Sequence, residues 1–205
     1  MAVAPSTISI SAIVVAAGLS SRMGGKSKLL LPWAGKRTII EATVRILLDS
    51  VVDEVIVVIG HDRERILGKL ESLPVHTVIN ESFADGLSTS IVRGVEAAGQ
   101  TPGGYLIALG DMPAIEGNTI AALCAQIARA GSGAIAVPAK GKRRGHPVVF
   151  GRDHREGLLA LSGDKGARGL IEANENNLHE VAVDDVGIFA DIDTPEAYAE
   201  ALRKA

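Results

Sequence analysis

The sequence predicts an α/β fold in which helices cover both faces of a mostly parallel sheet. Short runs rich in β-branched residues alternate with amphipathic segments along the chain, which is the pattern of repeated strand–helix units. Residues 8–16 form an almost uninterrupted apolar run, typical of a central strand buried on both faces. The 205 residues contain no linker, repeat or low-complexity segment, so we expect one domain over residues 1–205.

Each later element has its own signal. After a loop over residues 18–35, Thr38 and Glu41 form the capping-box pattern that starts a helix. Thr194 as N-cap, with Pro195 at the first helical position, predicts the start of the last helix. Further strands are predicted at residues 55–59, 75–79, 105–109, 134–137, 147–150 and 181–183. Apolar stripes at helical spacing predict helices that include residues 40–48, 66–70, 88–98, 120–127 and 167–173.

The composition argues against several classes of protein. A net charge of -3 and an aromatic fraction of 3% argue against nucleic-acid partners and against binding to a membrane surface. The single Cys124 excludes an intramolecular disulfide and a thiolate metal cluster, and its apolar neighbours predict an inert core thiol. The apolar run near the start has no basic segment before it and leads into a glycine-rich turn. We therefore interpret it as a strand, not a signal peptide, and expect a cytoplasmic protein.

The loop after the first strand concentrates small residues and cations. Arg22, Lys26 and Lys28 lie within seven positions of one another, next to glycines and serines. The loop fails the dinucleotide pattern GxGxxG, because position 16 is Ala, and the P-loop pattern, because position 20 is Ser. Exposed backbone N–H groups with Arg and Lys side chains suit a triphosphate, but a solvated basic turn explains the same residues.

Two acidic loops also follow predicted strands. Asp111 comes directly after the strand at 105–109, and Asp193 precedes the last helix. Each alone fits a turn or a helix start, but the carboxyl ends of parallel strands share one edge of a sheet. Together they predict a Mg²⁺ site, because hard oxygen ligands favour that ion over zinc. Converging carboxylates repel each other, so neutralising either is expected to leave fold stability unchanged or raise it.

These residues resemble the MobA-like nucleotidyltransferases, and within them the molybdenum cofactor cytidylyltransferases. The leading motif is Val15-Ala16-Ala17-Gly18-Leu19-Ser20-Ser21-Arg22-Met23-Gly24, with Lys28 after it. Further matches follow in the family's order at residues 86–91, 110–113, 144–147, 163–168 and 191–195. The resemblance covers the chain from residue 13 to the final helix, and its specificity comes from the number, order and spacing of the motifs.

The resemblance implies a Rossmann-like, three-layer α/β/α fold of the nucleotide-diphospho-sugar transferase type, and it assigns roles to individual residues. Arg22 and Lys28 would hold the triphosphate and, with Asp111, form the catalytic set. Asp111 and Asp193 would bind Mg²⁺, with Mn²⁺ as an alternative. The implied nucleotide-binding residues are Ala16, Ala17, Gly18, Arg22, Lys28, Gly86, Ser88 and Ser90. The implied acceptor-binding residues are Arg144, Gly145, His146 and Pro147. The family pattern assigns no role to Lys26 or Met112.

The implied reaction transfers CMP from CTP to a molybdopterin-type cofactor, with release of pyrophosphate. Ala16-Ala17-Gly18 favours CTP, because guanylyl-transferring relatives tend to carry Gly-Gly there. The alternatives are a GTP-using enzyme and a transferase for sugar or polyol phosphates. Two further alternatives are a non-catalytic factor that hands the cofactor to a molybdenum hydroxylase and an NAD(P)-dependent oxidoreductase. The failed GxGxxG pattern argues against the last, and the pair Asp111 and Asp193 favours catalysis over binding alone.

Overall fold

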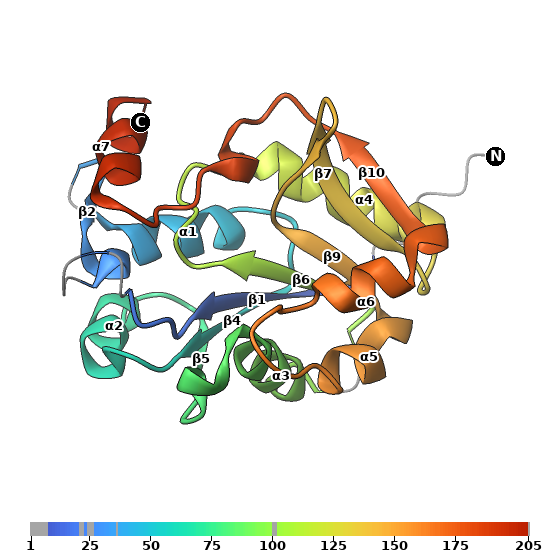
Figure 1. Cartoon of the computed structure of the whole chain (residues 1–205), viewed down its shortest axis with the longest axis horizontal. Helices are drawn as coiled ribbons and strands as arrows, with labels where there is room; N and C mark the ends of the chain where they lie inside the picture. Colours follow the sequence, from blue (N-terminus) through green and yellow to red (C-terminus); the bar gives the residue numbers. More distant parts are fainter. Residues whose placement is uncertain (1–7, 21–22, 24–26, 36, 100–101, 205) are drawn as a thin grey trace.

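The computed structural model describes residues 8–20, 23, 27–35, 37–99 and 102–204. Its centre is an eight-stranded sheet, with seven strands in the order β10-β7-β9-β6-β1-β4-β5 and the short β8 paired to β7 (Figure 1). The strands are β1 (Ile10–Ala16), β4 (Glu54–Ile59), β5 (His76–Ile79), β6 (Gly104–Leu109), β7 (Ile135–Lys140), β8 (Arg143–Arg144), β9 (Val148–Gly151) and β10 (Leu178–Ala182). A separate two-stranded hairpin joins β2 (Pro32–Trp33) to β3 (Arg37–Thr38). The mostly parallel α/β fold predicted from the sequence is confirmed.

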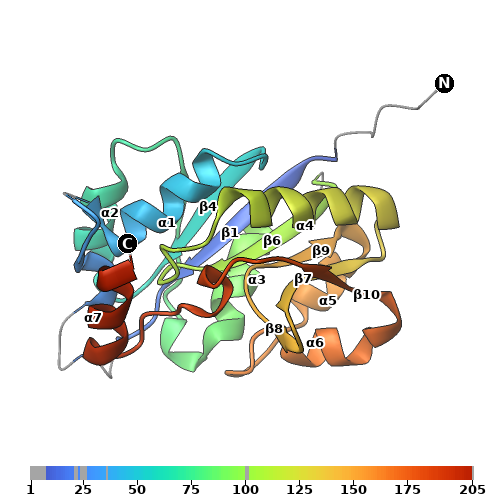
Figure 2. The same cartoon turned by 90° about the horizontal axis from the view of Figure 1, so that it is seen from above.

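Helices cover both faces of the sheet, as Figure 2 shows in the view from above. One face carries α1 (Ile39–Leu48), α2 (Arg63–Leu70), α4 (Gly117–Ala130) and α7 (Pro195–Lys204), and the other carries α3 (Leu87–Ala97), α5 (Arg155–Leu159) and α6 (Arg168–Ala173). The central strand β1 supplies both cores, because successive side chains point to opposite faces. Ala12 and Val14 pack with the first set of helices, whereas Ile13 packs with the second.

The predicted helix starts are confirmed by their hydrogen bonds. The N-cap Thr38 and Glu41 form a capping box at α1, in which the Thr38 backbone N–H donates to Glu41 Oε2 at 2.8 Å. Thr194 Oγ1 accepts a hydrogen bond from the Ala197 backbone N–H at 3.2 Å at the start of α7. The strand predicted at 181–183 begins earlier, since β10 spans Leu178–Ala182 and pairs in parallel with β7. None of the helices in the described ranges has the length and hydropathy that a bilayer crossing needs.

Two strands run opposite to the rest of the sheet, the short β8 and β9. β9 pairs antiparallel with both β6 and β7, whereas β1, β4, β5, β6, β7 and β10 run parallel. The N-terminal end of β9 therefore lies at the same edge as the carboxyl ends of β1 and β6. This brings the segment 144–147, which precedes β9, to the edge where ligands bind in open α/β sheets.

Candidate active site

At this edge a lysine joins the two predicted acidic loops. Lys28, the first residue of a short 3-10 helix, donates from Nζ to Asp111 Oδ2 and to Asp193 Oδ1, the latter at 2.6 Å. These contacts connect residues 83 and 165 positions apart in the chain. The side chains are only 16%, 10% and 24% exposed, in the order Lys28, Asp111 and Asp193. We call these three residues the charge cluster.

Backbone contacts fix the position of both carboxylates. Gly110 N–H donates to the Val15 carbonyl at 3.0 Å, and a Cβ on Gly110 would lie only 3.1 Å from the same oxygen. Glycine therefore lets the ends of β1 and β6 come close together, with Asp111 directly after the junction. The Asp111 carbonyl accepts from Ile192 N–H at 3.1 Å, which joins the two acidic loops next to Asp193.

Lys28 keeps its positive charge in the charge cluster although its side chain is mostly buried. Burial disfavours the charged form of Lys28, but the attraction of Asp111 and the hydrogen bonds to Asp111 and Asp193 outweigh it and raise its pKa. The pKa of nearby Asp191 is also raised, first by burial and then by the negative charge of Asp193. Lys28 thus stays protonated at neutral pH and compensates part of the negative charge. The ion pairs with Lys28 also change the expectation for stability. Neutralising Asp111 or Asp193 removes a partner from a buried ammonium, so we now expect it to lower the free energy of unfolding instead of leaving it unchanged or raising it.

The donor set fits a hard divalent cation. The second oxygen of Asp111, Oδ1, is buried and has no hydrogen-bond partner among the described residues. Buried polar atoms are normally satisfied, so this oxygen is available to a ligand. Within the described residues no group of three or more His, Cys, Asp or Glu side chains could hold a metal. Two carboxylates would therefore need further oxygens, such as those of a triphosphate or water, to complete a shell.

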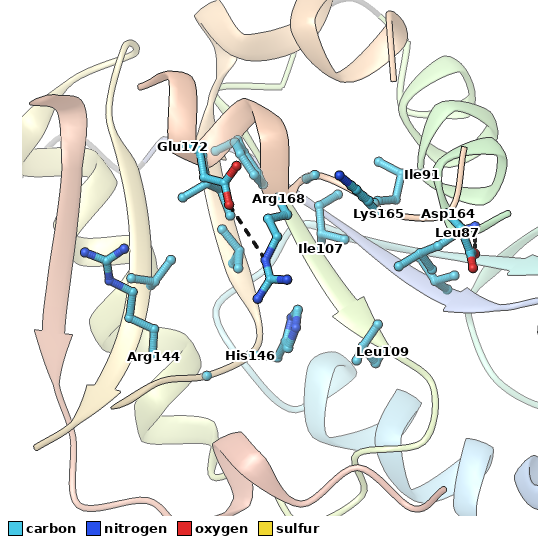
Figure 3. A pocket seen from close by; sticks show the side chains of 18 of the residues that line it. Leu87, Ile91, Ile107, Leu109, Arg144, His146, Asp164, Lys165, Arg168 and Glu172 are labelled. Carbon is cyan, nitrogen blue, oxygen red and sulfur yellow. Dashed lines mark hydrogen bonds and ion pairs between the residues drawn. The ribbon is translucent and has the colours of Figure 1, made fainter. Parts of the chain in front are cut away.

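A cavity of about 690 Å³ opens beside the cluster, on the face covered by α3, α5 and α6. Part of its apolar lining comes from the strands, namely Val15, Ile107, Leu109, Val148 and Phe150, and part comes from α3 and α6. Polar and charged side chains come from 144–146, from 164–168, and from Glu172 and Glu175. In Figure 3, Arg168 and His146 lie next to each other in the cavity, and Arg168 is ion-paired with Glu172 at 3.9 Å.

The predicted acceptor-binding residues have different environments. Arg144 and Gly145 line the cavity, but Arg144 Nε donates to Glu180 at 2.6 Å and Gly145 packs tightly against Ile188. Pro147 is buried after a cis peptide bond and is not part of the cavity lining. His146 is the member best placed to meet a ligand. Its Nδ1 is buried and has no hydrogen-bond partner within the described ranges.

The electrostatic state of His146 follows from its surroundings. Burial lowers its pKa below the usual value of 6.5, and the opposing influence of Asp111 and Asp191 is weaker. The imidazole is therefore neutral at neutral pH. It can form a hydrogen bond with a ligand, but it brings no positive charge to the cavity.

The predicted nucleotide loop is only partly described. Ala16 and Ala17 are buried at the end of β1, whereas Gly18 is exposed and a Cβ there would meet nothing within 4 Å. Arg22 and Lys26 lie outside the described residues, so the predicted contact of Arg22 with the triphosphate stays a prediction.

The second predicted nucleotide segment shapes the start of α3. Gly86 has a φ of +117°, and a Cβ there would lie 2.5 Å from the Gly163 carbonyl oxygen. Ser88 Oγ donates to the Ser162 carbonyl at 3.2 Å, and Ser90 Oγ accepts from Asn80 Nδ2 at 2.9 Å. The hydroxyls of Ser88 and Ser90 therefore have partners within the protein, and their contact with nucleotide stays a prediction.

Sequence reasoning missed two features of this edge. One is the role of Lys28 as the bridge between Asp111 and Asp193, and the other is the apolar cavity lining. Alternation along the strands could have indicated the second, since Ile107 and Leu109 point to the same face.

The comparisons with known proteins agree with this geometry. The model of the MobA-like NTP transferase domain matches residues 12–181. The chain belongs to this family. A nucleotidyl transferase from Methanothermobacter has the same fold, with a TM-score of 0.82, 31% identity, and coverage of 96% of this chain and 97% of that one. A Mycobacterium tuberculosis Rv0371c structure in complex with manganese has a TM-score of 0.79 and 25% identity, over 96% and 100% of the two chains.

Two curated relatives that align with nearly the whole of this MobA-like chain carry different kinds of name. The molybdenum cofactor cytidylyltransferase of Escherichia coli is 29% identical over 95% of this chain and 96% of its own length. The nicotine blue oxidoreductase of Paenarthrobacter nicotinovorans is 28% identical over 91% of this chain and 93% of its own length. Membership of the family thus establishes a nucleotidyltransferase fold, and the choice of reaction has to be argued from the site.

Proposed function

We propose that this protein transfers CMP from CTP to a phosphate group of a molybdopterin-type cofactor and releases pyrophosphate. The observation that carries the proposal is the charge cluster of Lys28, Asp111 and Asp193 beside a large, partly apolar cavity. Nucleotidyl transfer brings two anionic reactants together, so it needs charge neutralisation and positioning more than a protein nucleophile.

The proposed reaction is a direct displacement at phosphorus and needs no covalent enzyme intermediate. An oxygen of the acceptor phosphate forms a bond to the α-phosphorus of CTP, while the bond from that phosphorus to the β-phosphate oxygen breaks. Pyrophosphate leaves with the electron pair of that bond. Mg²⁺ or Mn²⁺, held by Asp111 and Asp193, would neutralise charge on the triphosphate. Lys28 and Arg22 would add positive charge there, and the apolar lining would exclude water that competes with the acceptor.

CTP and the acceptor are supported by different observations. Ala16-Ala17-Gly18 stands where guanylyl-transferring relatives tend to carry Gly-Gly, and this difference favours CTP. The apolar part of the cavity lining suits a flat ring system, and the charged side chains of the lining, among them Arg144, Lys165 and Arg168, suit a phosphate group attached to it. The molybdenum hydroxylase partner has no support in the described residues and is not part of the proposal. The cytoplasmic location stays a prediction.

A screen of CTP, GTP, ATP and UTP, each with Mg²⁺, tests the nucleotide. A nucleotide at a hundred times its Kd should stabilise the protein by about 2.7 kcal/mol, seen as a rise in melting temperature. We expect CTP to give the largest rise and to release pyrophosphate when a molybdopterin-type acceptor is added. An equal or larger rise with GTP would overturn the base assignment.

A second candidate is an oxidoreductase that uses NAD(P)H. The relative named nicotine blue oxidoreductase aligns with nearly the whole chain, and the apolar cavity could hold a flat ring substrate. The intact charge cluster favours nucleotidyl transfer, since hydride transfer needs no paired carboxylates with a lysine between them. Oxidation of NAD(P)H, followed by its absorbance in the presence of a quinone-like dye, would favour the oxidoreductase.

A further inference from the structure

The position of Lys28 raises the question of how a divalent cation reaches Asp111 and Asp193. Its ammonium already donates hydrogen bonds to one oxygen of each carboxylate. A metal ion that binds both carboxylates would bring two units of positive charge to the same two side chains. Two cations on the same pair of carboxylates repel each other strongly in a site this well shielded from water.

We propose that Lys28 is a built-in counter-cation, which holds Asp111 and Asp193 in the nucleotide-free protein and moves to the triphosphate when nucleotide and metal bind together. This inference rests on the proposed function and adds an order to it: the divalent cation binds well only with the nucleotide.

The geometry allows this movement to stay within one side chain. The Lys28 backbone N–H donates to Ser20 Oγ at 3.3 Å, and the next residue, Leu29, is buried in the core. The main chain is therefore anchored, whereas the lysine side chain has four rotatable carbons and a compact charge. The free Oδ1 of Asp111 gives an incoming cation a first ligand before Lys28 leaves.

The energetics favour joint binding. If a metal displaced Lys28 without nucleotide, a mostly buried ammonium would lose both carboxylates and gain no new anion. A triphosphate supplies that anion and also adds oxygen ligands to the metal. Metal and nucleotide should therefore strengthen each other's binding, and such coupling is reciprocal.

The test is the affinity of the nucleotide-free protein for Mn²⁺, measured by the electron paramagnetic resonance signal of free Mn²⁺. We expect Lys28→Met, which removes the ammonium and keeps most of the side-chain volume, to bind Mn²⁺ at least tenfold more tightly than the wild type. Lys28→Arg keeps the positive charge and should bind as weakly as the wild type. Lys140→Met is the matched control, because it breaks an exposed ion pair with Asp184 and should change nothing. Equal Mn²⁺ affinity of Lys28→Met and wild type would overturn the inference.

A measurement on the wild type covers the case in which Lys28→Met does not fold. With ¹³C-labelled lysine, the ε-methylene signal of Lys28, assigned by its loss in Lys28→Arg, should shift on addition of Mg²⁺ with CTP. Mg²⁺ alone at the same concentration should leave the signal in place, and a full shift with Mg²⁺ alone would contradict the inference. Failure of the proposed function looks different: the wild type would then neither bind CTP nor release pyrophosphate.

Discussion

Asp193 receives a hydrogen bond from a lysine 165 positions earlier in the chain, so its carboxylate belongs to a shared set of charges. Asp193→Asn keeps the size of the side chain but removes a charge and a hard ligand. Turnover should fall about 100-fold or more, equivalent to about 3 kcal/mol of transition-state stabilisation. The free energy of unfolding should fall by about 1–2 kcal/mol, because Lys28 keeps only one charged partner.

Pyrophosphate release and urea unfolding measure these two effects separately. Asp184→Asn is the control, since Asp184 pairs with Lys140 on the surface and should affect neither quantity. Normal turnover of Asp193→Asn at low Mg²⁺ would show that Asp193 only starts a helix.

His146 has the only neutral, buried ring nitrogen in the described cavity lining. His146→Ala should raise the KM for the acceptor about tenfold, the value of one lost hydrogen bond, and leave the KM for CTP unchanged. Because the pKa of His146 lies below 6.5, its ring is almost entirely neutral well above that pH, so the acceptor KM of the wild type should not change between pH 7.5 and 8.5. A steady rise of that KM across this range would show that a charged histidine binds the acceptor.

The sequence predicted that Asp111 and Asp193 lie together at this site, but it did not predict that Lys28 pairs with both of them. Asp111 and Asp193 each follow or precede a strong element signal, so the parallel-sheet rule alone places them at one edge. The bridge made by Lys28 depends on the rotamer of one long side chain, which no local pattern determines. The cavity has the same limit, because its shape follows from how α3, α5 and α6 pack on the sheet.

At the scale of elements, the capping box of α1 makes a measurable contribution. Thr38→Ala removes the N-cap and should lower the free energy of unfolding by about 1 kcal/mol.

Burial alone would raise the pKa of Glu41, but its hydrogen bonds from Thr38 lower the pKa below 4.5. The contribution of Glu41 to stability is therefore present above pH 4.5 and disappears as the pH falls through the lowered pKa. Unfolding at pH 7 and pH 3 should show a smaller pH dependence in Glu41→Gln than in the wild type.

The packing of α3 on the sheet depends on one glycine. A Cβ on Gly94 would lie 2.2 Å from Ile13 Cγ2, in a stiff β-branched side chain at the centre of the sheet. Gly94→Ala should therefore destabilise the protein by about 2–3 kcal/mol. Gly68→Ala is the matched control in α2, where a Cβ meets nothing within 4 Å and should stabilise the protein by about 0.5–1 kcal/mol. Similar unfolding midpoints for the two variants would show that α3 can move away from β1.

The elements that sequence reasoning missed are all short. The hairpin of β2 and β3 has two residues in each strand, and α5 has five residues. Such segments are too short to repeat a hydrophobic pattern twice, so they take their conformation from tertiary contacts. The long elements repeat their pattern several times, which explains why the mostly parallel sheet was predictable.

At the scale of the whole molecule, Cys124 reports on global unfolding. Burial, with a smaller effect of Asp53, raises the pKa of Cys124 to about 11, and its side chain packs in the core. The thiol should therefore not react with a disulfide reagent at pH 8 in the native protein, and labelling should follow the rate of global unfolding. Rapid labelling without denaturant would show that α4 opens locally.

The order of the strands has a consequence for synthesis on the ribosome. β1 receives its second neighbour, β6, only when residues 104–109 have been made, although its own residues emerge near the start. Its first neighbour, β4, is complete at residue 59, so at 5–20 residues per second a nascent chain carries this half-paired strand for roughly 3–10 s. During that interval the uncharged edge of Ile10–Ala16 is open to pairing with other nascent chains. Chains arrested at residue 80 should bind a holdase chaperone and released full-length chains should not, so a strand from the interior of the finished sheet is the one that most needs protection during translation.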